Sequence, residues 1–187
     1  MTAKGVADYQ EIANLVSDSH FLVDTGRWSE LTSTVFVREA DGLVPEADFG
    51  FACWRGTDEI DAGFGQAMPR FAHAVHAIAN LHVAVDGDRA TARYYVQGWH
   101  WFAAEDAAGD AVGSREAPAA AGAVVSSNRS GEPNADFLVL GVMTDTLVRQ
   151  DGRWRVLTRR LARLGPGMAV GAGRPWLQGL GQGDPPA

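Results

Sequence analysis

Cysteine is almost absent from the chain, with Cys53 the single example among 187 residues. A lone cysteine cannot form an intrachain disulfide, and no cysteine cluster exists to bind structural zinc or an iron–sulfur centre. Nothing in the sequence points to the cationic surroundings that activate a nucleophilic thiol. We therefore expect Cys53 to be a small core residue beside Trp54.

The chain also lacks long hydrophobic runs and an excess of positive charge. No apolar stretch approaches the roughly 20 residues that span a bilayer, and residues 1–8 do not resemble a secretory leader. Lysine and arginine number 16 against 23 acidic residues, for a net charge of −7, whereas binding to nucleic acid phosphates needs clustered cations. We therefore expect a cytoplasmic protein with neither a membrane nor a nucleic acid as partner.

Apolar residues are plentiful, at 46% of the chain, and they suffice for a full core in one domain of this length. We expect the domain to cover residues 1–164. Two segments depart from its regular pattern. Residues 103–136 are rich in alanine, glycine, serine and charge, which predicts a flexible insertion that is either a lid or disordered. Residues 165–187 are rich in glycine and proline and are expected to form a C-terminal tail.

Helical periodicity dominates the first part of the chain. Apolar residues recur at helical spacing over residues 9–23, and Gly26 ends the run. A short second helix is expected around residues 28–31, followed by a strand over residues 35–43. This order places two helices ahead of the sheet.

A third helix is expected to begin at Asp58, with Thr57 as its capping residue. Acidic residues in its first turn suit the positive end of a helix dipole. The same helix, broken near Pro69, is expected to carry His73 and His76.

Two hairpins follow. The alternating run over residues 83–102 contains an Asp-Gly turn at positions 86–87, and residues 137–164 contain another at 151–152. On the second strand of the first hairpin, alternation predicts one shared face for Tyr94, Val96, Gly98, His100 and Phe102. Helices followed by long antiparallel strands predict an α+β domain with its helices packed on one side of the sheet.

The best candidates for chemistry are His76 and His100, which a curved sheet can bring to one cavity. Histidine has the side-chain pKa nearest neutrality, so two imidazoles facing one pocket can remove one proton and return another. We interpret His73 and His82 as surface or structural residues. A metal site on His73 and His76 is a weak hypothesis, because no acid lies at the matching offset.

Five short segments resemble the SnoaL-like family of the nuclear transport factor two-like superfamily. In order, they are Val23-Asp-Thr-Gly-Arg-Trp28, Gly56-Thr-Asp-Glu-Ile60, His76-Ala-Ile-Ala-Asn80, Val85-Asp-Gly-Asp-Arg-Ala90 and Asp151-Gly-Arg-Trp-Arg155. The resemblance covers most of residues 9–163. It implies a cone, in which a curved antiparallel sheet and N-terminal helices enclose a hydrophobic pocket, and it implies a homodimer.

The resemblance also implies chemistry, because His76 and His100 match the two histidines of dehydratase-like members. His100 is the better candidate for removing a carbon-bound proton, His76 for donating to a leaving hydroxyl or polarising a carbonyl, and Asp24 for orienting one imidazole. The walls against a hydrophobic substrate are expected from Phe36, Trp54, Tyr94, Val96, Phe102, Phe137 and Met143. No metal or cofactor is expected.

Several functions remain open from the sequence. A dehydratase, cyclase or isomerase acting on an apolar carbonyl or polyketide-like compound, in bacterial secondary or steroid-type metabolism, fits the paired histidines. A non-catalytic subunit that binds a small molecule or supports a partner enzyme fits the same fold. An epoxide hydrolase would need an Asp–Arg–Asp arrangement, which the sequence does not assemble.

Overall fold

The computed structural model describes residues 3–50, 52–102, 137–164 and 168–169. The expected insertion at 103–136 and most of the expected tail at 165–187 lie outside the described residues. The elements are α1 (Ala3–Asp24), α2 (Trp28–Val35), β1 (Glu46–Asp48), β2 (Cys53–Arg55), α3 (Thr57–Ala67), the 3-10 turn η1 (Met68–Arg70), β3 (Phe71–Asp86), β4 (Arg89–Phe102), β5 (Phe137–Gln150), β6 (Arg153–Arg163) and β7 (Met168–Ala169).

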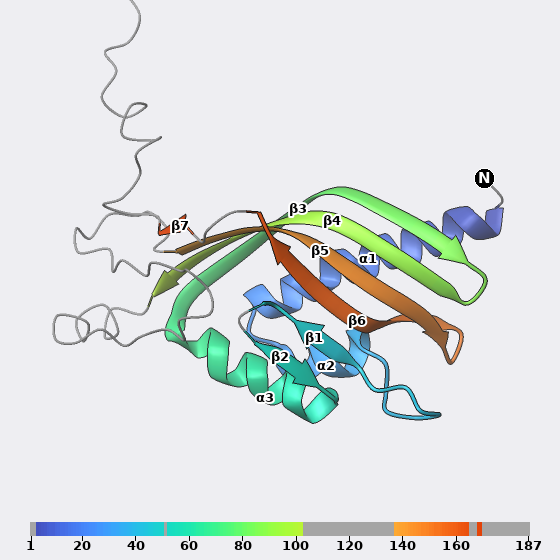
Figure 1. The fold of residues 1–187 in the computed structure, drawn as a ribbon, viewed down its shortest axis with the longest axis horizontal. Coiled ribbons are helices and arrows are strands. Elements are labelled where there is room, and N and C mark those ends of the chain that lie inside the picture. The colour runs from blue at the N-terminus through green and yellow to red at the C-terminus, as the bar shows by residue number, and fades with distance from the viewer. Residues whose placement is uncertain (1–2, 51, 103–136, 165–167, 170–187) are drawn as a thin grey trace, which may run out of the picture.

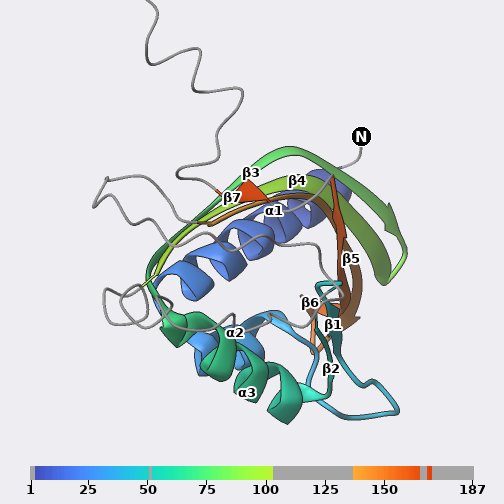
Figure 2. The same cartoon turned by 60° about the vertical axis from the view of Figure 1, so that its left-hand side comes forward.

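A strongly curved sheet wraps around helix α1, and α2 and α3 lie across the open side (Figure 1). The strand order is β2-β1-β6-β5-β4-β3, with β7 paired to β5. Figure 2 looks into the curve and shows α1 lying in the hollow of the sheet. The α+β class and the cone with N-terminal helices are therefore confirmed. The sheet is mixed and not wholly antiparallel, because β1 runs parallel to β6.

Helix α1 is amphipathic, and its buried face sets the position of the site. Ile12 and Val16 are fully buried, and the polar residues Ser19 and His20 continue the same face inward. The helix ends at Asp24, where Gly26 adopts a left-handed conformation with φ 71° and the Arg27 N–H donates to the Leu22 carbonyl at 2.9 Å. This stop leaves the Asp24 side chain at the end of the helix.

The strand β3 corrects the expected position of two histidines. His73 and His76 lie on this strand and not on a helix, since α3 gives way to η1 at Met68–Arg70 and β3 begins at Phe71. Pro69 lacks the N–H that would continue the helix, and the segment pairs instead with β4, placing His76 opposite Gly98. Strand alternation then sends His73 and His76 to opposite faces.

Three smaller expectations also fail. Residues 35–43 form no strand, because α2 continues to Val35 and only isolated bridges follow, at Phe36 and at Ala40. Thr57 does not cap α3; the cap position is Gly56, and Glu39 accepts the Thr57 N–H at 2.7 Å. Cys53 is exposed and not part of the core.

Candidate active site

The candidate site begins with a carboxylate–imidazole pair. Asp24 accepts two hydrogen bonds from His76, one from its backbone N–H to Oδ2 at 2.9 Å and one at Oδ1 from ring Nδ1 at 2.6 Å. The side chains are 19% and 15% exposed, so the pair is largely shielded from water. A carboxylate can only accept, which assigns the proton to Nδ1. In its neutral form His76 then carries its lone pair on Nε2, the atom a general base needs.

His100 joins this pair on the concave face of the sheet. Its ring centroid lies 5.2 Å from that of His76, with the two planes at 81°, and the side chain is 5% exposed. The ring centroid of Phe71 lies 4.6 Å from that of His100. The side chains of His76, His100 and Asp24 thus lie close together, and their catalytic role stays a prediction.

The imidazoles of His76 and His100 both fit on this face because residue 98 is a glycine and has no Cβ atom. This residue pairs with His76 across the sheet and lies two positions before His100 on the same face. A methyl group there would come within 2.9 Å of His76 Nε2, closer than Cβ atoms approach other atoms in folded proteins, and 3.0 Å from His100 Cε1, tighter than most such contacts. Gly98 is therefore part of the site, although it carries no reactive group.

The Gly98→Ala substitution is expected to lower turnover by about a hundredfold, because it displaces both imidazoles by a few tenths of an ångström or more. The loss of stability should stay within about 1–3 kcal/mol, the usual cost of overpacking. Gly65→Ala is the matched control, since nothing lies within 4 Å of a methyl group at that helical glycine. Steady-state kinetics and urea unfolding of both variants check this; equal activity of the two would contradict the assigned role.

A third histidine, His20 of α1, was missed as a site residue in the sequence. Its ring stacks on that of His76, with centroids 5.6 Å apart and planes at 27°, and it is 6% exposed. Burial, the charge of Arg159 and the neighbouring His76 hold the pKa of His20 well below its usual value. The signal available in the sequence was its place on the buried face of α1, where a polar residue requires a partner.

Behind His20 lies a buried network of polar side chains. His20 Nε2 is 3.3 Å from the Tyr94 hydroxyl, which donates to Asp145 Oδ2 at 3.2 Å. Arg159 donates to Oδ1 and Oδ2 of Asp145 at 2.9 and 2.7 Å, and to the Ser19 hydroxyl at 3.1 Å. Burial raises the pKa of Tyr94 well above its usual value, so the phenol keeps its proton. No sequence pattern predicted this Asp145–Arg159 pair.

The depressed pKa of His20 predicts a dependence of stability on pH. Above the ordinary value of 6.5 both the folded and the unfolded chain hold a neutral imidazole, and the stability contribution is complete. Below pH 6.5 the His20 imidazole is protonated in the unfolded chain but stays neutral when buried in the folded chain. The free energy of unfolding therefore falls by up to about 1.4 kcal/mol per pH unit. Urea unfolding between pH 7.5 and 5 should show this fall, and His20→Phe should reduce it. An unchanged slope in His20→Phe would contradict the assignment.

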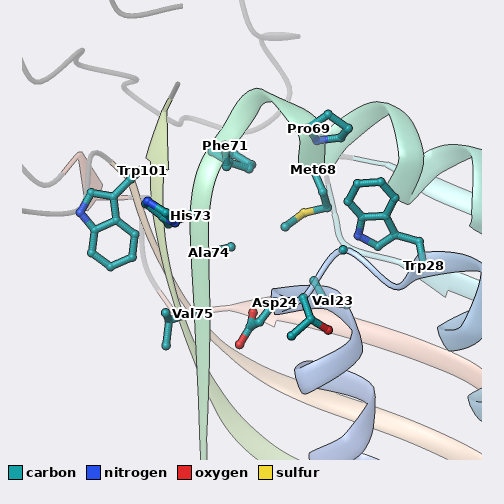
Figure 3. A pocket seen from close by; sticks show the side chains of 12 residues that line it. Val23, Asp24, Trp28, Met68, Pro69, Phe71, His73, Ala74, Val75 and Trp101 are labelled. Carbon is teal, nitrogen blue, oxygen red and sulfur yellow. The ribbon is translucent and has the colours of Figure 1, made fainter. Parts of the chain in front are cut away.

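A cavity of about 550 Å³ opens where Asp24 meets the start of β3. Figure 3 shows Asp24 and Met68 on one side of the β3 ribbon, and His73 and Trp101 on the other. The cavity is lined by the end of α1, the following turn, Trp28 of α2, η1, the first residues of β3 and Trp101 of β4. His73, interpreted as a surface or structural residue from the sequence, thus lines the cavity as well.

Five of the residues expected to contact the substrate lie away from this cavity. Tyr94 and Val96 face the concave side of β4, and Met143 lies opposite Tyr94 on β5; all three are at most 4% exposed. Phe36 is fully buried below Arg159, and Trp54 packs with Phe49 and Phe64 at the far edge of the sheet from β3.

None of these five residues is among those lining the cavity at Asp24. Phe102 and Phe137 lie at strand ends, and their side chains fall outside the described part of the chain. The contact role of all seven residues stays a prediction.

The described residues offer no group of three or more His, Cys, Asp and Glu side chains arranged to hold a metal ion. The particular hypothesis of a site on His73 and His76 fails, because the two side chains leave opposite faces of β3. Within the same part of the chain, no helix is long and apolar enough to cross a membrane.

The fold is thus a cone with a histidine cluster on its concave face and a cavity beside Asp24. The chain belongs to the family of the SnoaL-like domain, whose sequence profile matches residues 5–160. No curated protein sequence matches the chain.

Solved structures repeat the fold at low sequence identity. The protein Kfla4162 from Kribbella flavida is 21% identical with a TM-score of 0.67, over 88% of this chain and 95% of its own. A protein from Novosphingobium aromaticivorans with a provisional scytalone dehydratase assignment is 18% identical with a TM-score of 0.65, over 93% and 99%.

The hexachlorocyclohexane dehydrochlorinase LinA-type3 from Novosphingobium barchaimii is 18% identical with a TM-score of 0.63, over 90% and 92% of the two chains. At these identities the similarity establishes the fold.

Proposed function

We propose that this protein is a cofactor-independent lyase or isomerase that acts on a small, apolar carbonyl compound by acid–base proton transfer. The observation that carries the proposal is the Asp24–His76 pair, hydrogen-bonded at 2.6 Å, with His100 at 5.2 Å from His76. A carboxylate largely shielded from water behind an imidazole fixes the tautomer and stabilises the imidazolium that forms when the base takes a proton.

The geometry favours exchanging the roles expected from the sequence. His76 is the stronger candidate for the base, because Asp24 holds its Nδ1 proton and leaves Nε2 as an acceptor. Nε2 would remove the proton from the carbon next to the carbonyl, and the electrons of that bond would form an enolate. His100, in its protonated form, would donate to the hydroxyl on the neighbouring carbon. That group would leave as water while the carbon–carbon double bond forms.

Two of the similar structures are compatible with this reaction class, since a dehydratase eliminates water and a dehydrochlorinase eliminates hydrogen chloride. The same acid and base would also serve an isomerase or a cyclase acting on a polyketide-like compound. The apolar side chains that line the cavity beside Asp24, among them Val23, Met68 and Phe71, suit a hydrophobic substrate. A place in bacterial secondary or steroid-type metabolism is part of the proposal.

The test is a panel of β-hydroxy ketones, polyketide-like aromatic ketones and steroid-type enones, incubated with the purified protein and followed by mass spectrometry. The proposal expects at least one compound to lose water, or to isomerise or cyclise without change of mass. Binding of panel members without any conversion would instead support the non-catalytic small-molecule-binding subunit.

We further propose a homodimer formed through the convex face of the sheet. Val75 on β3 and Tyr95 on β4 are 51% and 43% exposed, so this face presents apolar groups to solvent. Light scattering should give twice the chain mass, and Tyr95→Arg should reduce it to that of the single chain. The cytoplasmic location and the absence of a nucleic acid partner stay predictions of the sequence.

A further inference from the structure

The row of rings on the concave face extends beyond the proposed acid and base. The His76 ring contacts two imidazoles, His100 edge-on at 5.2 Å and His20 stacked at 5.6 Å with the planes at 27°. His20 in turn meets the Tyr94 ring edge-on at 5.6 Å. His76 therefore contacts one imidazole of the sheet and a second one of helix α1.

The donor and acceptor of each hydrogen bond behind His20 can be assigned by starting at Arg159, the end of the network farthest from His20. Arg159 can only donate, and it binds both oxygens of Asp145, which therefore act as acceptors. The Tyr94 hydroxyl must then give its single proton to Asp145, as its distance of 3.2 Å to Oδ2 allows. The Tyr94 oxygen is left to accept from His20, which assigns a proton to Nε2 of that imidazole.

The two stacked imidazoles thus receive opposite tautomers. Asp24 assigns the proton of His76 to Nδ1, and the network from Arg159 assigns the proton of His20 to Nε2. The same network keeps His20 neutral, because a cation there would lie in a buried position near the Arg159 charge. The groups facing His20 are His76 from β3, Tyr94 from β4, Arg159 from β6, and Asp145 from β5 through Tyr94.

We propose that His20 is a positioning residue: the hydrogen-bond chain Arg159–Asp145–Tyr94 holds it as a neutral, Nε2–H imidazole flat against His76, which fixes the His76 ring toward His100. A neutral ring face also accommodates an imidazolium at His76, whereas a second cation would repel it. The inference rests on the proposed function only in giving His76 the role of base.

The first test reads the tautomers directly, by long-range ¹H–¹⁵N correlation on full-length protein labelled at its five histidines. The expected result at neutral pH is a single Nε2–H form for His20 and a single Nδ1–H form for His76. An Nδ1–H form or a mixture at His20 would overturn the proposal. No substrate is needed, so this result stands apart from the success or failure of the turnover screen.

The second test removes one link of the chain. Tyr94→Phe should abolish the single tautomer of His20 and leave that of His76 intact, because Asp24 still holds the latter. Tyr95→Phe is the matched control, since the neighbouring residue of β4 faces the opposite side of the sheet and is 43% exposed. An unchanged His20 signal in Tyr94→Phe would overturn the assigned network.

The third test asks whether His20 acts on His76. His20→Ala should remove the nuclear Overhauser contact between the His76 and His100 rings and lower kcat about tenfold with little change in KM. His20→Phe supplies another flat neutral ring and should restore the ring contact. Thermal unfolding of both variants checks that they fold. A ring contact that survives in His20→Ala, or stays lost in a folded His20→Phe, would overturn the positioning role.

Discussion

Replacing His76 by glutamine is expected to lower the turnover of any compound converted by the wild-type protein by about a hundredfold to ten-thousandfold, the usual contribution of a general base. Glutamine fills a similar volume and keeps the backbone N–H that donates to Asp24. It cannot accept a proton from carbon at neutral pH, so the loss should fall on kcat. The measurement is the rate of product formation by mass spectrometry, at saturating substrate.

His82→Gln is the control for that variant. His82 lies on the same strand but is exposed and beyond the bulge at residues 79–82, away from Asp24 and His100. Its loss should leave the rate unchanged. Equal losses in the two variants, or a fall in melting temperature that accounts for the loss in His76→Gln, would remove the support for His76 as the base.

The largest expected effect on stability comes from breaking the Asp145–Arg159 pair. Arg159→Met leaves the Asp145 carboxylate fully buried without its cation, and should lower the free energy of unfolding by about 3–5 kcal/mol. The paired replacement of Asp145 by leucine and Arg159 by methionine should recover much of this loss, because no charge then remains buried. Urea unfolding of the single and double variants measures both effects.

The neighbouring residue on β6 gives a matched control for the arginine. Arg160 also contacts a carboxylate, Glu46 at 3.2 Å, but its side chain is 65% exposed. Exposed ion pairs contribute at most about 1 kcal/mol, so Arg160→Met should change stability little. If Arg159→Met were no more destabilising than Arg160→Met, the buried pair would have no structural role.

Much of the fold could be predicted from the sequence because its strongest patterns are local. The amphipathic first helix ends as expected near Gly26, and both Asp-Gly turns join the antiparallel pairs that alternation predicted. The failure at residues 70–80 has a physical reason. Alanine favours helices, and His73 and His76 have helical spacing, but pairing with β4 outweighs these weak intrinsic preferences.

Part of the site could be predicted and part could not. The family resemblance pointed to His76, His100 and Asp24, and their side chains lie close together even though His76 lies on an unexpected element. Of the three, Asp24 lines the described cavity, and the catalytic role of all three stays a prediction. Asp145 and Arg159 were missed because their contact depends on register. A shift between Thr146 and Leu147 places Arg159 opposite Asp145, and uniform counting from the turn would have placed Thr158 there.

The most direct test of the central claim is the incorporation of deuterium from D₂O at the carbon next to the carbonyl of a bound ketone. The experiment compares the wild-type protein with Asp24→Asn and His76→Gln, and mass spectrometry follows the exchange. An acid–base site built on Asp24 and His76 predicts exchange by the wild type and a loss of at least about a hundredfold in both variants. Ketone binding with no exchange above the rate in buffer would contradict it, and would identify the cone as a binding module.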